Sequence, residues 1–455
     1  MTTRDNPLGK EPVGKLLRQF AIPSIIAMIV GALYNMVDQF FIGRNVGELG
    51  NAATNIAFPL STSCVAIALL FGIGGASAFN LSVGRGEKDR AGGYIGNAIF
   101  GMVGLGLILS ISTLVMLKPM LFFFGASERV IVYALPYTRI TAFGFPFLIL
   151  GTGGGHLIRA DGSPKMTMIC NLTGAVINTV LDFLFVSCFK WGMEGAAIAT
   201  IIGQIIAAGI AIYYFVFRFK TVKLNASSFR IRGSYIGRVV MLGMAPCTNQ
   251  LAMMVVQIVM NKSLKYYGGM SVYGEDIPIA CVGIVSKVAM VFFSIIIGIS
   301  QGLQPIVSYN YGAANYQRVK KAYKTAMTVS LVLSVAAFAV FQIFPRNIVA
   351  VFGKGSEEYY SFAVTYFRAF MLFVGINFVQ PISSNFFTAI GKPVKGVFLS
   401  LTRQILFLLP LILILPVYLG INGIIYAAPV ADFIAFLVTG FMVLREFEHP
   451  EFRTA

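Results

Sequence analysis

Long apolar stretches separated by short polar segments run through almost all of the 455 residues. About 20 consecutive apolar residues are enough to cross a bilayer as a helix, and twelve such stretches are present. The first six are residues 15–43, 52–82, 92–117, 131–158, 165–189 and 193–217. The second six are residues 237–263, 279–311, 320–344, 360–388, 394–418 and 422–445. The pattern predicts an all-α polytopic membrane protein with twelve transmembrane helices.

Composition and charge agree with a membrane protein. Hydrophobic residues make up 57% of the chain and charged residues 12%, about half the charged share of a typical soluble domain. The 35 Lys and Arg outnumber the 18 Asp and Glu, and they gather in the loops on the side of the N-terminus. By the positive-inside rule, both termini are expected in the cytoplasm. Because the excess cations follow the loops, they predict topology and no nucleic-acid partner.

The second half of the chain repeats the first. Sliding the sequence on itself by about 228 residues aligns many glycines, and one residue more aligns several aromatic and basic positions. Matched pairs include Gly74 with Gly302, Gly84 with Gly312, Tyr137 with Tyr366, and Arg139 with Arg368.

Six crossings return the chain to the face where it started, so the two halves share one orientation. Such repeats are related by a pseudo-twofold axis along the membrane normal. We therefore expect two six-helix lobes, with an N-lobe at residues 1–217, a basic cytoplasmic linker at 218–238 and a C-lobe at 239–455. Alternating access would operate in the cleft between them.

Two carboxylates, Asp38 and Asp182, lie inside the first and fifth predicted spans. A charge in the hydrocarbon core costs several kcal/mol, so intramembrane acids usually mark a functional path. In the second half, the matching positions are Asn261 and Pro410. The acid pair is therefore expected to belong to the N-lobe alone.

Polar residues accompany these acids on three predicted helices. Spacings of three or four residues place each pair on one helix face. The pairs are Asn35 with Asp38, Asn178 with Asp182, and Ala196 with Thr200. At about 1.5 Å per residue, all three patches lie roughly 8 to 11 Å below the outer surface. The pattern predicts one polar constellation at one depth.

Two carboxylates at one depth repel each other until a proton or a cation lies between them. Carboxylates, the Asn178 amide, the Thr200 hydroxyl and a backbone carbonyl near Ala196 are oxygen ligands suited to a hard cation such as Na⁺. The same oxygens serve H⁺, so the residues leave both ions open. In the alternative interpretation, the Asn and Thr side chains only join helices by hydrogen bonds.

Asp432 is a third intramembrane acid, and Arg403 lies at a similar predicted depth. A structural ion pair is the first interpretation, because buried acids in spans are usually paired. A second proton site or a substrate contact is the alternative.

Polar residues in the C-lobe spans are candidates for substrate contacts, because polar groups within the membrane tend to face inward. They are Gln257, Asn261, Gln304 and Asn377. The 40 Phe and 19 Met suit varied flat cations through aromatic and thioether contacts.

Motifs for catalysis or nucleotide binding are weak or missing. Residues 298–302 match G-x-S-x-G, but the segment lies in an apolar helix instead of a turn between strand and helix. The chain contains no G-x-x-x-x-G-K-[ST] segment. We therefore expect no enzyme and no cofactor.

Several longer segments resemble one transporter family over essentially all twelve spans. The segments are NPLG at residues 6–9, FAIPS at 20–24, LYNMVDQFFIG at 33–43, NTVLDFLF at 178–185 and GAAIAT at 195–200. Together they resemble the MATE (multidrug and toxic compound extrusion) family, and within it the MepA-like branch of bacterial multidrug exporters.

The resemblance implies two lobes arranged as a V in a bacterial-type inner (plasma) membrane. It implies export of lipophilic, often cationic compounds in exchange for inward H⁺ or Na⁺. By the family pattern, the coupling ion binds Asp38, Asn178, Asp182 and Thr200 with the Ala196 carbonyl, and Tyr34 adjoins this site. A duplicated chain holds a complete pathway, so a monomer is expected to suffice.

The family pattern is not complete in this chain. NorM-like members carry an acid where this chain has Met254, so the resemblance does not extend to a C-lobe ion site of that kind. Intramembrane Arg139, Arg368 and Arg403 keep an alternative function open. That alternative is a flippase for a lipid-linked precursor on a similar scaffold.

Overall fold

The computed structural model describes residues 6–274, 276–351 and 357–453, and most of them are helical. The helices of the first half are α1 (Pro7–Lys10), α2 (Val13–Asn45), α3 (Glu48–Gly84), α4 (Lys88–Val115), α5 (Leu117–Phe123), α6 (Glu128–Ala160), α7 (Pro164–Asp182), η2 (Phe183–Cys188) and α8 (Gly192–Phe217). The second half contains η3 (Ala226–Phe229), α9 (Gly233–Gly269), α10 (Asp276–Gly312), α11 (Tyr316–Ile343), α12 (Pro345–Val351), α13 (Glu357–Phe370), α14 (Val379–Ala389), α15 (Pro393–Leu401), η4 (Thr402–Leu408), α16 (Leu409–Leu419), α17 (Ile421–Phe447) and α18 (Pro450–Arg453).

The all-α membrane fold is confirmed. Within the described residues, eleven helical stretches are long and apolar enough to cross a membrane. The predicted span 360–388 differs, because α13 ends at Phe370, residues 371–378 form turns, and α14 begins at Val379. These turns are almost entirely apolar, so the hydropathy pattern did not register the break.

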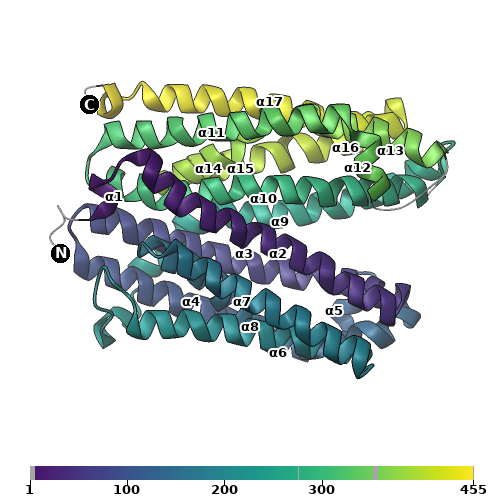
Figure 1. Ribbon diagram of the computed structural model, residues 1–455, viewed down its shortest axis with the longest axis horizontal. Helices are drawn as coiled ribbons and strands as arrows, with labels where there is room; N and C mark the ends of the chain where they lie inside the picture. Colours follow the sequence, from purple (N-terminus) through teal and green to yellow (C-terminus); the bar gives the residue numbers. More distant parts are fainter. Residues whose placement is uncertain (1–5, 275, 352–356, 454–455) are drawn as a thin grey trace.

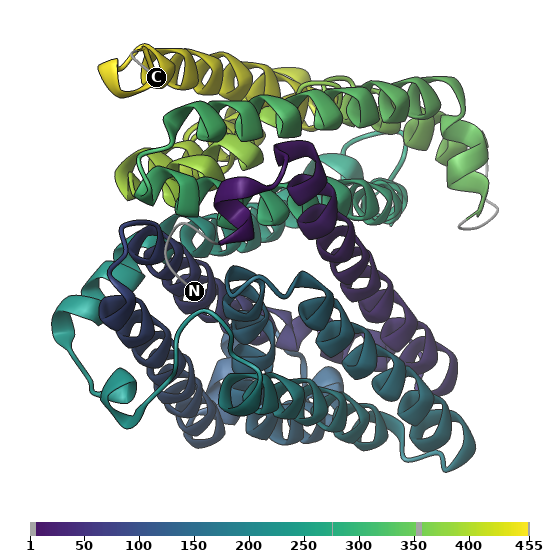
Figure 2. The same cartoon turned by 60° about the vertical axis from the view of Figure 1, so that its left-hand side comes forward.

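The helices gather into two lobes (Figures 1 and 2). In the N-lobe, α6 packs against α3, α4 and α8, and α7 packs against α2 and α8. In the C-lobe, α9 packs against α15, α10 against α11 and α14, and α16 against α17. Both chain ends lie at the same end of the molecule (Figure 1), which we call the terminus side.

The lobes meet through equivalent glycines of the sequence repeat. A Cβ on Gly84 of α3 would lie 2.2 Å from the Tyr309 carbonyl oxygen of α10. A Cβ on Gly312 of α10 would lie 2.3 Å from the Leu81 carbonyl oxygen of α3. The two backbones therefore approach so closely that only glycine fits. This reciprocal contact agrees with the predicted pseudo-twofold axis.

A second pair of repeated glycines makes the same kind of contact. Gly74 of α3 packs on Val239 of α9, and Gly302 of α10 packs on Ala21 of α2. Val239 and Ala21 both lie within the first nine residues of their helices. Gln304 of α10 adds a buried hydrogen bond across the lobes, because its Nε2 donates to Ser77 Oγ of α3 at 2.8 Å.

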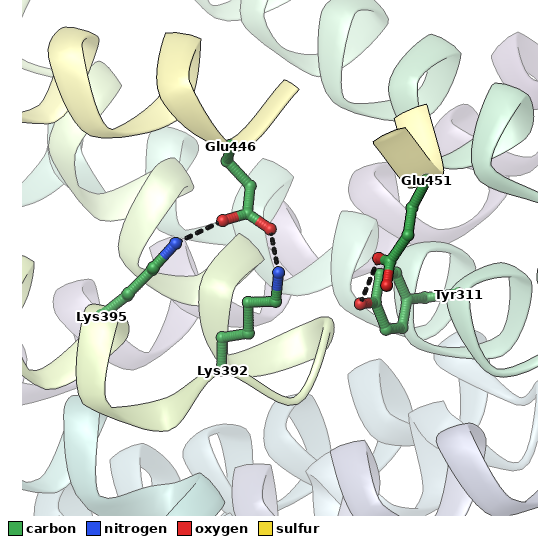
Figure 3. Close-up of polar contacts among 5 residues, drawn as sticks. All are labelled: Tyr311, Lys392, Lys395, Glu446 and Glu451. Atoms are coloured by element: carbon green, nitrogen blue, oxygen red, sulfur yellow. Dashed lines mark hydrogen bonds and ion pairs between the residues drawn. The ribbon is translucent and has the colours of Figure 1, made fainter. Parts of the chain in front are cut away.

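A buried acidic residue joins neighbouring segments by hydrogen bonds or ion pairs on the terminus side of each lobe. In the C-lobe, the Glu446 side chain is 0% exposed and accepts from Lys392 and from Lys395, the latter at 2.6 Å (Figure 3). The same view shows Tyr311 donating to Glu451 at 3.1 Å. These contacts tie α17 and the chain end to neighbouring helices.

In the N-lobe, Asp161 plays a comparable part between α6 and α7. It accepts from the Tyr214 hydroxyl at 2.7 Å and from the backbone N–H groups of Lys220 and Thr221. Burial raises the pKa of the Asp161 carboxyl above its ordinary value, and these hydrogen bonds oppose the shift. The loop that leaves α8 is thereby held against the lobe.

Candidate functional site

The packing of α2 on α7 brings Asp38 and Asp182 together. The two carboxyl groups are close enough to interact electrostatically. Two ionised carboxylates repel each other, so a proton on one of them or a cation between them would stabilise this arrangement. The expected grouping of the two acids is therefore present in the fold.

Asp182 occupies a break in helix geometry. It is the last residue of α7, and the chain continues as the π-helix η2. There, the Phe189 N–H donates to the Leu184 carbonyl five residues earlier, at 2.8 Å. Such π-turns often occur at functional sites, because they disturb the regular pairing of backbone groups. The C-terminal end of α2 packs on η2, where Asn45 donates to Ser187 at 3.0 Å.

Helix α8 completes the cluster through Thr200. Asn178 Nδ2 donates to Thr200 Oγ1 at 3.4 Å, and the Tyr34 side chain lies near Thr200. Ala196 is fully buried one turn earlier in α8. A carbonyl inside a helix already accepts the N–H four residues later, so the Ala196 carbonyl has only its second lone pair to offer.

Acceptor atoms in this cluster outnumber the donors. Asp38 Oδ1, Asn178 Oδ1 and both carboxylate oxygens of Asp182 are buried and receive no hydrogen bond from a donor group. Asp182 itself is 0% exposed. Buried acceptors without partners cost about 1–3 kcal/mol each, and more when charged. A positive charge shared by these oxygens would remove that cost.

One neighbour of the acids was not predicted, and one predicted neighbour lies elsewhere. Tyr137 of α6 interacts electrostatically with Asp38, Asp182 and Tyr34. Its repeat pairing with Tyr366 was the available signal in the sequence. Asn35 is exposed on α2, and its amide donates to the Gly31 carbonyl of the same helix at 2.8 Å.

The third acid has a different environment. Asp432 of α17 is 2% exposed and accepts from the Arg403 guanidinium of η4. Its second oxygen accepts from Asn377 Nδ2 at 2.8 Å. The predicted ion pair is confirmed. Asn377, predicted as a substrate contact, has its amide engaged in this cluster.

The other three predicted substrate contacts divide between two places. Gln257 and Asn261 lie on an exposed side of α9, where Gln257 Nε2 donates to Asn261 Oδ1 at 3.0 Å. Gln304 is buried between the lobes and bonds to Ser77. Of the four, Gln257 and Asn261 are the pair with exposed side chains.

Two repeated helical lobes that meet along the membrane normal are an architecture found in membrane transporters. Sequence comparison agrees, because the MatE family model matches residues 23–184 and 246–414. The chain therefore belongs to the MatE family.

Relatives and solved structures cover nearly the whole chain. The multidrug export protein MepA of Staphylococcus aureus strain N315 is 24% identical over 426 residues, 93% of this chain and 92% of MepA. The MepA of Staphylococcus haemolyticus strain JCSC1435 is 24% identical over 429 residues, 94% of this chain and 93% of that protein.

Two solved structures share the fold with a TM-score of 0.90. One is an outward-facing conformation of a multidrug resistance MATE family transporter, 22% identical, covering 98% of this chain and 99% of that one. The other is a MOP superfamily transporter from Pyrococcus furiosus, 21% identical, covering 98% of each chain, whose reversed pocket polarity suggests a different function for that protein.

Proposed function

We propose that this protein is a secondary antiporter that exports lipophilic, often cationic compounds in exchange for inward H⁺ or Na⁺. The observation that carries the proposal is the set of buried oxygens at Asp38, Asn178 and Asp182 that lack donors. Either ion supplies the missing positive charge. The Thr200 hydroxyl and the Ala196 carbonyl are the remaining ligands for Na⁺.

Coupling requires the ion to favour one arrangement of the lobes, because a ligand shifts an equilibrium only by its differential affinity. The acid cluster lies between α2 and α7, and α2 also packs on α10 of the C-lobe. Filling the cluster therefore acts on the helix that contacts both lobes. An inward ion also gains about 2.3 kcal/mol per charge per 100 mV of membrane potential.

The substrate class rests on the relatives, since two of them are multidrug export proteins. A bacterial-type plasma membrane and cytoplasmic termini follow from the same kinship and from the basic loops. One chain contains both lobes of the pathway, so the transporter works as a monomer.

The test is efflux of a fluorescent lipophilic cation from proteoliposomes, driven separately by an inward Na⁺ gradient and an inward H⁺ gradient. Wild type is compared with Asp38→Asn and Asp182→Asn, which keep the shape of the side chain and remove the charge. We expect efflux under one gradient and background rates for both variants. The gradient that works identifies the ion.

Glu128→Gln is the matched control, because Glu128 is an exposed acid at the start of α6. It should transport like wild type. Efflux that persists in Asp38→Asn and Asp182→Asn would contradict the coupling site. Absence of efflux under both gradients would contradict antiport of this substrate class.

A further inference from the structure

A groove of about 840 Å³ lies between α2, α10 and α11 on the terminus side. Its wall is largely apolar and is formed by residues from all three helices. The apolar residues deepest along α2, α10 and α11 are Ile22, Ile25, Ile299, Val329 and Leu333. Ile22, Val329 and Leu333 expose 53%, 41% and 38% of their surface. The acid cluster shares none of the residues that line the groove.

Basic side chains lie at the end of this groove on the terminus side. Lys15 and Arg18 of α2 line it directly. A neighbouring hollow of about 480 Å³ on α11 shares Thr325 and Val329 with the groove. That hollow is lined by Lys320, Lys321 and Lys324.

The positive charge at this end is largely uncompensated. Lys15 pairs with Glu11 at 3.3 Å, and Lys320 lies over the Phe447 ring at 5.9 Å. Lys321 and Lys324 are exposed and form no ion pair with an acid in the described part of the chain. Neither hollow is lined by Asp or Glu.

Along both helices, basic residues come first and apolar residues follow, as an amphipathic ligand with a charged head and an apolar chain would require. Lys15 is near the start of α2, and Ile25 follows ten residues later, about 15 Å deeper along the helix. On α11, Lys320 near the start is followed by Val329 and Leu333 in the same direction. Charge therefore lies at the membrane surface and the apolar wall runs toward the membrane core.

We propose that this groove binds an anionic phospholipid from the leaflet on the terminus side. The phosphate of the headgroup contacts the cations of α2 and α11, and an acyl chain lies along the apolar wall. Basic pockets between transmembrane helices recognise anionic lipid headgroups in this way. The charge favours an anionic lipid over a zwitterionic one.

A lipid in this position touches α2 and α11 together. The start of α2 is already held on the C-lobe, because Arg318 of α11 donates to the carbonyls of Leu8 and Glu11 at 3.1 and 2.7 Å. The lipid adds a bridge between the same helices. It therefore stabilises the arrangement in which α2 packs on the C-lobe.

The experiment measures lipid binding to the purified full chain by native mass spectrometry, titrating phosphatidylglycerol or phosphatidylcholine. The test variant is Lys320→Gln/Lys321→Gln/Lys324→Gln. We expect its affinity for phosphatidylglycerol to fall roughly tenfold or more, since each cation near the surface contributes to anionic-lipid binding. Binding of phosphatidylcholine should not change.

The matched control is Arg218→Gln/Lys220→Gln/Lys223→Gln, which removes the same charge from exposed residues after α8. This control should bind phosphatidylglycerol like wild type.

Val329→Ser/Leu333→Ser tests the apolar wall and should weaken the binding of long-chain phosphatidylglycerol. Equal losses in both triple variants, or no loss in the first, would overturn the proposal. Displacement of the lipid by inorganic phosphate would also overturn it, because the site would then be an anion site. None of these variants alters the acid cluster, so the result is independent of antiport.

Discussion

In the C-lobe, the Asp432 carboxylate accepts one hydrogen bond from the Arg403 guanidinium and another from the Asn377 amide. In the N-lobe, Asp182 receives no hydrogen bond from any donor group and has another carboxyl group, that of Asp38, as its neighbour. Both acids are buried in transmembrane helices. The first is paired with a cation of its own lobe, whereas the second has no such partner; under the proposed function, the coupling ion supplies that positive charge.

The surroundings make the contrast sharper, because the two lobes share a scaffold. Each cluster adjoins a π-helical segment, η2 after Asp182 and η4 around Arg403. Each also interacts electrostatically with a tyrosine at equivalent repeat positions, Tyr137 in the N-lobe and Tyr366 in the C-lobe. The same framework thus holds a paired and an unpaired acid. The two clusters therefore differ in the compensation of charge and not in the burial of an acid, and the proposed coupling role rests on that difference.

The largest effect is expected from removing the unpaired charge. Asp182→Asn should reduce ion-driven efflux to the background of protein-free vesicles. It should leave the melting temperature of the purified protein unchanged or higher, because it relieves repulsion with Asp38. Parallel transport assays and thermal unfolding check both expectations. A large drop in melting temperature would place Asp182 with the structural acids.

Removing the paired charge should act on stability first. Asp432→Asn leaves the partly buried Arg403 guanidinium without its counter-charge, and breaking such a pair costs up to about 3–5 kcal/mol. Thermal unfolding measures the loss. Arg403→Met/Asp432→Asn removes both charges and should recover most of the stability. If the double variant were as unstable as the single one, the ion pair would not explain the role of Asp432.

Helical spacing and span depth were enough to group several of these residues in advance. The internal repeat predicted two lobes, and similar depth predicted the Arg403–Asp432 pair, which the structure confirms. The proximity of Asp38 and Asp182 was also expected from depth. Their role in coupling stays a prediction.

The sequence did not predict which face of each helix packs against its neighbours. Spacing places Asn35 beside Asp38, but only packing decides that the Asn35 side chain is exposed while Tyr137 of α6 interacts with the acids. The amide of Gln304 looked like a ligand for substrate, yet it closes the contact between lobes. The turns at 371–378, which place Asn377 beside Asp432, lie in an uninterrupted apolar run.

Substitutions of the glycines between the lobes test a feature that the two lobes share. Gly84→Ala and Gly312→Ala should each weaken the contact between α3 and α10 by about 1–3 kcal/mol, because each Cβ meets a backbone carbonyl of the other lobe. Spin labels at Arg85→Cys and Ala313→Cys, in a background without native cysteines, should report a longer distance between α3 and α10.

Gly209→Ala on α8 is the control for the glycine variants, since a Cβ there meets no atom within 4 Å. It should be neutral or stabilising by up to about 1 kcal/mol. Unequal effects of Gly84→Ala and Gly312→Ala would show that the lobes do not contribute symmetrically to this contact, although their glycines are equivalent in the repeat.

The smallest effect is expected from the two tyrosine hydroxyls. Tyr137→Phe removes a polar group beside the N-lobe acids, and the loss of one such interaction costs about 0.5–1.5 kcal/mol. The ion concentration that gives half-maximal efflux should therefore change roughly two- to tenfold. Tyr366→Phe is the matched control, because its neighbour Arg403 is already neutralised by Asp432. It should leave the ion dependence unchanged. Equal shifts in both variants would mean that the two acid clusters respond alike to the coupling ion, and the contrast between the lobes would then fail.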